Sequence, residues 1–74
     1  PQWAALRANL GSVAMKRGDP RSAIVSFEEG LRALERKGQE HTTNAVMTRL
    51  SLATALVASG QDERARAQLE AAAA

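Results

Sequence analysis

The sequence has no cysteine and a single histidine among its 74 residues. The absence of cysteine excludes disulfides, cysteine-ligated metals and thiol nucleophiles. One imidazole is too little for a His-rich metal site or a Ser-His-Asp triad. No apolar run approaches the ~20 residues that a membrane span requires, and no signal-peptide pattern is present. We therefore expect a protein that is not an enzyme, binds no metal or cofactor and does not insert into a membrane.

Aromatic residues are also scarce, because Trp3 and Phe27 are the only two rings and make up 3% of the chain. Two rings are too few for a surface on which nucleic-acid bases stack. Ten basic and eight acidic residues give a net charge of +2, and the two signs alternate along the chain. This alternation is typical of solvated faces, so nucleic acid is not the expected partner. The length suits one small intracellular domain, expected in the cytoplasm, or part of a larger one.

Helix-forming residues dominate what is present. Alanine accounts for 16 residues, and leucine, arginine, glutamate and glutamine for 26 more. These residue types favour helix, whereas no stretch alternates apolar and polar residues as a half-buried strand does. The composition therefore predicts an all-α protein with closely packed helices.

Three glycines divide the chain at nearly regular intervals. Gly18 precedes Asp19-Pro20, the pattern of a helix-ending glycine followed by an N-cap aspartate and a first-turn proline. Gly38 follows two cations and precedes the polar segment 40–44, and Gly60 precedes an acidic helix start. The punctuation predicts four helices, near residues 2–17, 20–37, 43–59 and 62–74. Connections this short make neighbouring helices antiparallel.

Each predicted helix carries apolar residues at helical spacing, which we expect to face the core. Small residues on these stripes allow close helix crossing, and Leu10 and Phe27 are expected to fill the space between the first two helices. The stripes comprise Trp3, Leu6, Leu10, Val13 and Ala14; Ala23, Ile24, Phe27, Leu31 and Leu34; Ala45, Leu52, Ala53 and Leu56; and Ala65 and Leu69. Met47 and Leu50 lie on a different side of the third helix.

Self-comparison reveals a repeat at an offset of 42 residues. Residues 4–32 align with 46–74, with five identities in 29 positions. The identities fall on the turn glycines and on packing positions: Arg7 with Arg49, Leu10 with Leu52, Gly18 with Gly60, Ala23 with Ala65 and Glu28 with Glu70. The chain therefore resembles two helix–turn–helix units.

The spacing of Leu10-Gly11, Ala23 and Phe27 resembles the signature of the tetratricopeptide repeat (TPR) family. Leu52-Ala53, Gly60, Ala65 and Leu69 match it in the second unit. The 42-residue period is similar to the extended subtype of kinesin light chains. The resemblance implies two TPR-like repeats, at about 4–41 and 42–74, in a right-handed α-solenoid. We expect a fragment of a longer array, with further repeats or subunits packed at its open ends.

The sequence departs from the family pattern at three points. The large aromatic residue common in the first helix is replaced by Ala14, and by Leu56 in the second unit. The proline that often closes a repeat is absent. Four alanines, at 71–74, leave the register of the fourth helix weakly specified.

Other candidate sites have ordinary structural interpretations. His41 lies in a polar connection and is expected to be solvated. Trp3 is expected in the core rather than as a binding hot spot. Lys16, Arg17 and Arg21 form a basic cluster that suits a solvated rim better than a phosphate site. The carboxylates Glu28, Glu29 and Glu35 lie among arginines, and an i,i+4 ion pair of Glu28 with Arg32 is expected.

The resemblance implies a non-catalytic scaffold or adaptor segment that binds a protein or peptide within a multiprotein assembly. Its groove would be formed by the first helix of each unit. The implied groove residues are Asn9, Ser12 and Lys16 with Met47, Leu50, Ser51 and Thr54, together with Ala5, Ala8 and Ala58. Alternatives are a regulatory or sensor TPR module of a signalling or transcription-regulatory protein, and an RNA-binding helical repeat. Because this groove offers one amide and one lysine, we do not expect it to clamp a C-terminal carboxylate.

Overall fold

The computed structural model describes the backbone of residues 3–73 and the side chains of residues 10–73. Within that range it contains helices and no strands: α1 (Trp3–Lys16), α2 (Pro20–Arg36), α3 (Thr43–Ala58) and α4 (Asp62–Ala73). The predicted all-α class is confirmed. The predicted ends at residues 2 and 74 lie outside the described residues, and every other predicted boundary is within one residue of the observed one.

The three turns end their helices in the same way. Gly18, Gly38 and Gly60 have φ angles of 74°, 70° and 80°, a left-handed conformation that costs glycine little. In each turn the glycine N–H donates to the carbonyl three residues earlier, at 3.0 Å, and the next N–H donates to the carbonyl five residues earlier, at 2.8–2.9 Å. The predicted helix-ending role of these glycines is confirmed. Gly18 and Gly60 thus occupy equivalent turns 42 residues apart.

Side-chain caps fix two of the helix starts. The Asp19 carboxylate accepts a hydrogen bond from the Ser22 N–H at 3.2 Å, and Pro20 begins α2. Hydrogen bonding from the Ser22 side chain and backbone holds the pKa of Asp19 below its ordinary value. Thr42 caps α3 by accepting from the Ala45 N–H at 3.3 Å. These caps satisfy donors that the first helical turn leaves free.

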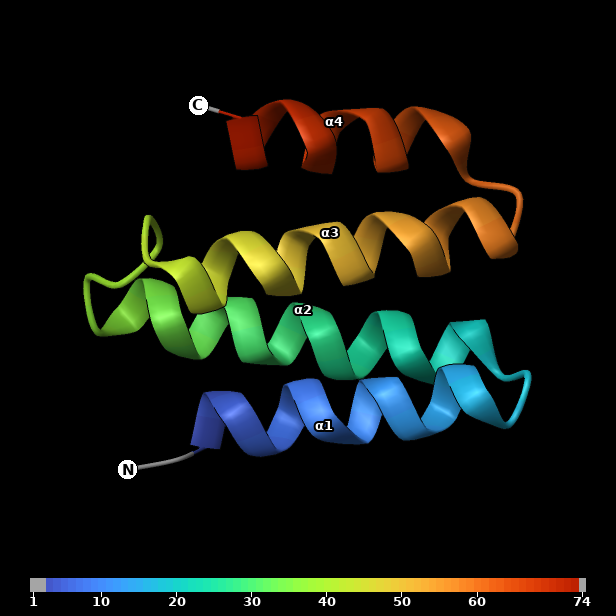
Figure 1. The fold of residues 1–74 in the computed structure, drawn as a ribbon, viewed down its shortest axis with the longest axis horizontal. Coiled ribbons are helices and arrows are strands. Elements are labelled where there is room, and N and C mark those ends of the chain that lie inside the picture. Colours follow the sequence, from blue (N-terminus) through green and yellow to red (C-terminus); the bar gives the residue numbers. More distant parts are fainter. Residues whose placement is uncertain (1–2, 74) are drawn as a thin grey trace.

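The four helices follow one another in an antiparallel row (Figure 1). Each helix packs along the next one in sequence, α1 also touches α3, and α1 and α4 have no contact within the described range. The Cα envelope is 15 Å thick in its shortest dimension, which corresponds to two helix layers at the usual axis spacing of about 8–10 Å. The contact between α1 and α3 indicates that these two helices form one layer. An ion pair between side chains of α2 and α4 indicates that those two helices form the other layer.

The core lies where α2 and α3 meet, since these two helices have neighbours on both sides. Phe27, Leu52 and Leu56 are the largest fully buried side chains. Most of the predicted stripe residues on α2, α3 and α4 join them, which confirms those assignments. The buried stripe residues are Ala23, Ile24, Leu31, Leu34, Ala45, Ala53 and Ala65.

Three predicted packing residues are instead about half exposed. Leu10 and Val13 on α1 are 45% and 46% exposed, and Leu69 on α4 is 48% exposed. The expectation that Leu10 fills the space between helices is therefore wrong. The reason is position in the row: α1 and α4 each have one full-length neighbour, whereas Leu52 on the inner helix α3 is fully buried. The predicted core positions of Trp3 and Leu6 lie outside the described side chains.

The Phe27 ring of α2 lies directly against Gly11 of α1. A Cβ placed on Gly11 would lie 2.6 Å from Cε1 of the Phe27 ring and 2.8 Å from Cδ1. Real carbon atoms do not approach so closely, so the ring occupies the space that any larger residue would need. In the second unit alanine replaces this glycine (Ala53) and leucine replaces the ring (Leu69).

We expect Phe27→Ala to lower the free energy of unfolding by about 3–5 kcal/mol, because the ring is fully buried. This loss is comparable with the whole stability of a small domain, so the variant should be unfolded at room temperature. Urea titration followed by circular dichroism measures it. Leu50→Ala, at a 43% exposed position, is the control and should change stability little. An unchanged unfolding curve for Phe27→Ala would contradict the packing described above.

The contact between Gly11 and Phe27 predicts a specific coupling. Gly11→Ala should destabilise the wild-type chain by about 1–3 kcal/mol, because the new methyl group overlaps the ring. In a Phe27→Leu background the same substitution should cost much less, because leucine lacks the ring atoms that the new methyl group would overlap. A double-mutant cycle in urea measures the coupling. If Gly11→Ala lowered the stability equally in both backgrounds, the Phe27 ring would not be what restricts the size of the side chain at position 11.

Candidate functional site

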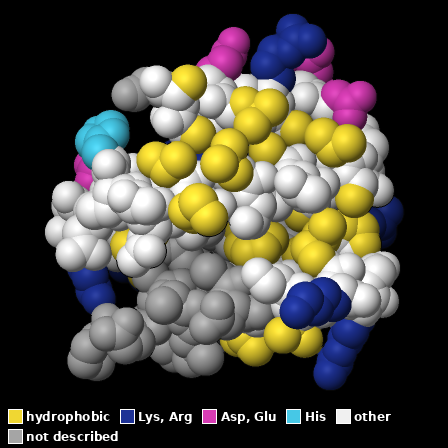
Figure 2. All heavy atoms as spheres, viewed as in Figure 1, with side chains coloured by type: hydrophobic (Ala, Val, Ile, Leu, Met, Phe, Trp, Pro, Cys, Tyr) yellow, Lys and Arg dark blue, Asp and Glu magenta, His cyan; other side chains and the backbone are white. Residues whose placement is uncertain are grey.

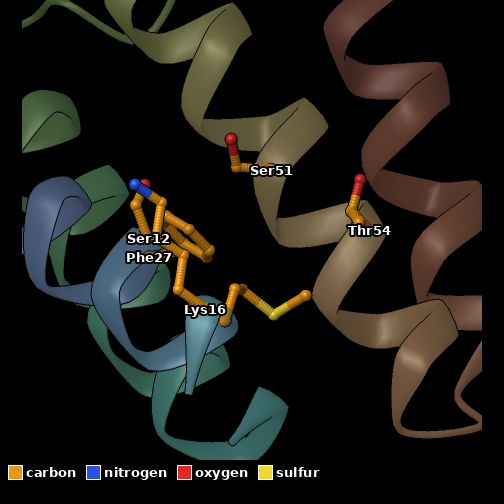
Figure 3. A pocket seen from close by; sticks show the side chains of 6 residues that line it. Ser12, Lys16, Phe27, Ser51 and Thr54 are labelled. Carbon is orange, nitrogen blue, oxygen red and sulfur yellow. The ribbon is translucent and has the colours of Figure 1, made fainter. Parts of the chain in front are cut away.

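A pocket of about 280 Å³ opens between α1 and α3. Four of its six lining residues are groove residues predicted from the sequence: Ser12, Lys16, Ser51 and Thr54. Figure 3 shows Ser12 and Lys16 coming from α1 on one side and Ser51 and Thr54 from α3 on the other. The structure therefore brings together residues that are about 40 positions apart in the sequence.

Apolar side chains complete the pocket. The Phe27 ring reaches it from α2, and Met15 lines it from α1. Phe27 is only 2% exposed, so the pocket opens onto the edge of the hydrophobic core. The missing Cβ at Gly11 leaves the room that the ring occupies. An apolar floor beneath a few polar groups is the usual character of a binding pocket in a protein surface.

The polar groups around the pocket differ in what they can still bind. The Thr54 hydroxyl donates to the Leu50 carbonyl at 3.1 Å, so its proton is already used within α3. Ser51 is half-buried and can donate and accept through its hydroxyl. Lys16, the last residue of α1, is exposed and supplies the one positive charge among the lining residues. The arrangement suits an apolar group flanked by hydrogen-bonding or anionic groups.

Met47 and Leu50 are exposed on α3, at 59% and 43%, but they do not line the pocket. Together with Ser51 and Thr54 they recur at i, i+3, i+4 and i+7, which places them on one face of the helix. Figure 2 shows hydrophobic side chains across the middle of the viewed face and acidic side chains only at its margin. The predicted groove residues Ala5, Ala8 and Asn9 lie outside the described side chains. Ala58 is exposed near the end of α3.

Sequence reasoning missed Met15 and Phe27 as pocket residues. Phe27 was assigned to the core by its stripe position alone, and a stripe predicts that a side chain is buried, not what its far edge reaches. Met15 was given no role. Met15 lies three residues after Ser12 and next to Lys16, so its place on α1 gave a usable signal. Phe27 comes from α2, and its arrival at the pocket depends on the crossing at Gly11.

The other sequence candidates stay on the surface. His41 is exposed in the connection between α2 and α3, as expected. Lys16, Arg17 and Arg21 are likewise exposed around the first turn. Trp3 lies outside the described side chains. Among the residues described, no group of three or more His, Asp or Glu side chains could hold a metal ion, and no helix is both long and apolar enough to cross a bilayer.

Carboxylates of α2 bind arginines of other helices. Glu28 pairs with Arg64 of α4, not with the expected Arg32 of its own helix. Arg64 also donates to the Gln61 side chain at 2.6 Å. The i,i+4 expectation failed because it considered one helix, whereas stacking brings α4 close to α2. The resulting ion pair ties together the layer opposite the pocket.

A second link runs through Arg49 of α3. Its guanidinium lies 3.7 Å from the Glu35 carboxylate of α2 and donates to the Gln68 side chain of α4 at 3.0 Å. Through these two contacts Arg49 joins α2, α3 and α4, and its side chain is only 15% exposed. It is not available to a ligand at the pocket.

No protein-family model, curated protein or solved structure matches the chain.

Proposed function

We propose that this chain is a non-catalytic protein-interaction segment that binds a protein or peptide across α1 and α3. As a scaffold or adaptor, it would hold that partner within a larger assembly. The observation that carries the proposal is the pocket itself, since it is lined by Ser12, Lys16, Ser51 and Thr54, which helical spacing and family resemblance predict as groove residues. Exposed Met47 and Leu50 extend an apolar contact surface along α3.

The internal repeat supports the TPR-like interpretation. The turns at Gly18 and Gly60 share their φ and hydrogen-bond pattern, as the turn at Gly38 also does, so the support comes from their equivalent positions 42 residues apart. Ala23 and Ala65, five residues after each glycine, are both buried, at 0% and 2% exposed. The first helices of the two units lie in one layer and the second helices in the other. Matching turns and this arrangement of layers are what a stacked helical repeat requires. We propose on this basis a pair of TPR-like repeats in a right-handed α-solenoid.

The same repeat indicates where a further repeat or subunit would pack. Leu10 and Val13 on α1 correspond to Leu52 and Ala55 on α3, which are fully buried in the row. The outer face of α1 therefore suits a helix with an apolar stripe like that of α2. On α4 the position of Ile24 is taken by Arg66, which is exposed, so the other end is less suited to apolar packing.

A double substitution tests the proposed groove. Met47→Asp with Leu50→Asp should weaken binding of a groove ligand at least tenfold, because it places unpaired charge in an apolar contact. The ligands are 12-residue peptides selected from a random display library on the 74-residue chain. Fluorescence anisotropy measures their dissociation constants, and circular dichroism checks that helicity is retained.

Val25→Asp with Leu69→Asp is the matched control. These side chains are 55% and 48% exposed on α2 and α4, so the control adds the same charge to apolar positions of similar exposure. It should leave affinity unchanged. Unaltered affinity for the folded Met47/Leu50 variant would show that the ligand does not contact this surface of α3 and would contradict the proposed groove.

A further inference from the structure

The acidic residues lie on α2, on α4 and in the connections between helices. Neither α1 nor α3 contains an aspartate or glutamate over their 14 and 16 residues. All eight acidic residues belong to α2, to α4 or to the connections: Glu28, Glu29 and Glu35; Asp62, Glu63 and Glu70; Asp19 and Glu40. The helices that flank the pocket therefore carry basic charge alone, from Arg7, Lys16 and Arg49.

The basic residues of these helices are not equivalent. Arg49 is held by Glu35 and Gln68 behind α3, whereas Lys16 lies exposed at the pocket rim. Asp19, the acidic residue nearest in sequence to Lys16, accepts the Ser22 N–H as the cap of α2. Arg17 and Arg21 are exposed in and next to the same turn. An approaching anionic group thus meets positive charge at this end of the pocket.

The pocket size restricts what can occupy it. A volume of about 280 Å³ is at the lower limit of small-molecule sites and equals roughly nine water molecules at about 30 Å³ each. One aliphatic side chain takes up only part of this volume, so the adjoining backbone of the ligand can enter the pocket as well, whereas a large cofactor does not fit. The Phe27 edge and the Met15 side chain offer it an apolar contact, and Ser51 can hydrogen-bond the adjoining backbone.

Building on the proposed function, we propose that the partner inserts one aliphatic side chain (Leu, Ile or Met) into this pocket and pairs a neighbouring Asp or Glu with Lys16. The acidic group remains at the solvated rim, so it need not lose its hydration. A C-terminal carboxylate buried between the helices would lose hydration with only hydroxyls and one lysine to replace it. The preference is thus for an internal segment that combines one apolar anchor with an acidic flank.

The experiment uses the same random 12-residue library, selected on the wild-type chain and counter-selected on Ser51→Trp, whose indole fills the pocket. Peptides that survive should be enriched in Leu, Ile or Met with Asp or Glu within three positions. Ser51→Trp should weaken their binding about tenfold or more. Thr54→Trp, at an exposed position, is the second pocket-filling variant if the first does not fold.

Charge reversal tests the rim. Lys16→Glu should weaken binding about two- to fivefold at low salt, with the difference shrinking as ionic strength rises. Lys37 is the other lysine of the chain and does not line the pocket. The same charge reversal there, Lys37→Glu, is the control and should leave the binding affinity unchanged. Substituting the peptide's acidic residue by Asn or Gln should remove the sensitivity to Lys16.

The outcomes separate the two proposals. Peptides taken from the wild-type selection before counter-selection make the two proposals distinguishable. If they respond to the Met47/Leu50 substitution but not to Ser51→Trp or Lys16→Glu, the anchor-and-acid inference is overturned and the proposed groove function stands. If they are insensitive to all of these variants, both are overturned. Failure to enrich any peptide against the pocket-filled variant would also overturn the anchor inference.

Discussion

The contact between the Phe27 ring and the bare backbone of Gly11 links the fold of this protein to its candidate site. The ring is buried against α1 where no Cβ could fit, and its edge forms part of the pocket wall. A residue larger than glycine at position 11 would push α1 and α2 apart, because a close-packed core cannot absorb the overlap. The same movement would open the pocket floor. Stability and the shape of the proposed binding surface therefore depend on one interhelical contact.

Position in the row determines how an equivalent residue behaves. Leu10 and Leu52 match across the 42-residue repeat, yet one is half-exposed and the other fully buried. Helix α3 has α2 on one side and α4 on the other, whereas α1 has one full-length neighbour. A helix buries its apolar residues only against the helices beside it, so the outer helices of the row leave exposed the residues that the inner helices bury. Burial here is set by neighbours as much as by residue type.

This dependence explains what the sequence could and could not predict. Helix boundaries follow from local chemistry, and the glycine turns, the Asp19 cap and Pro20 place them to within a residue. The stripe on α2 also holds, since α1 and α3 both pack against that helix. Exposure of Leu10 and Leu69 could not follow from periodicity, which predicts the direction of a side chain but not whether another helix covers it. The pairing of Glu28 with Arg64, 36 residues away, required knowledge of the stacking order.

The stacking order also explains how charge can be separated between the two layers. Carboxylates on α2 find partners on α3 and α4, where Arg49 and Arg64 bridge between helices. Because these pairs lie away from the pocket, α1 and α3 can present serine, threonine and exposed apolar side chains beside a single lysine. Such a surface has little charge to desolvate when a partner binds, so the cost of association is low. With Lys16 at its rim, the same surface attracts a segment with an acidic flank and disfavours one with a basic flank. The charge therefore gives the proposed interaction specificity as well as affinity.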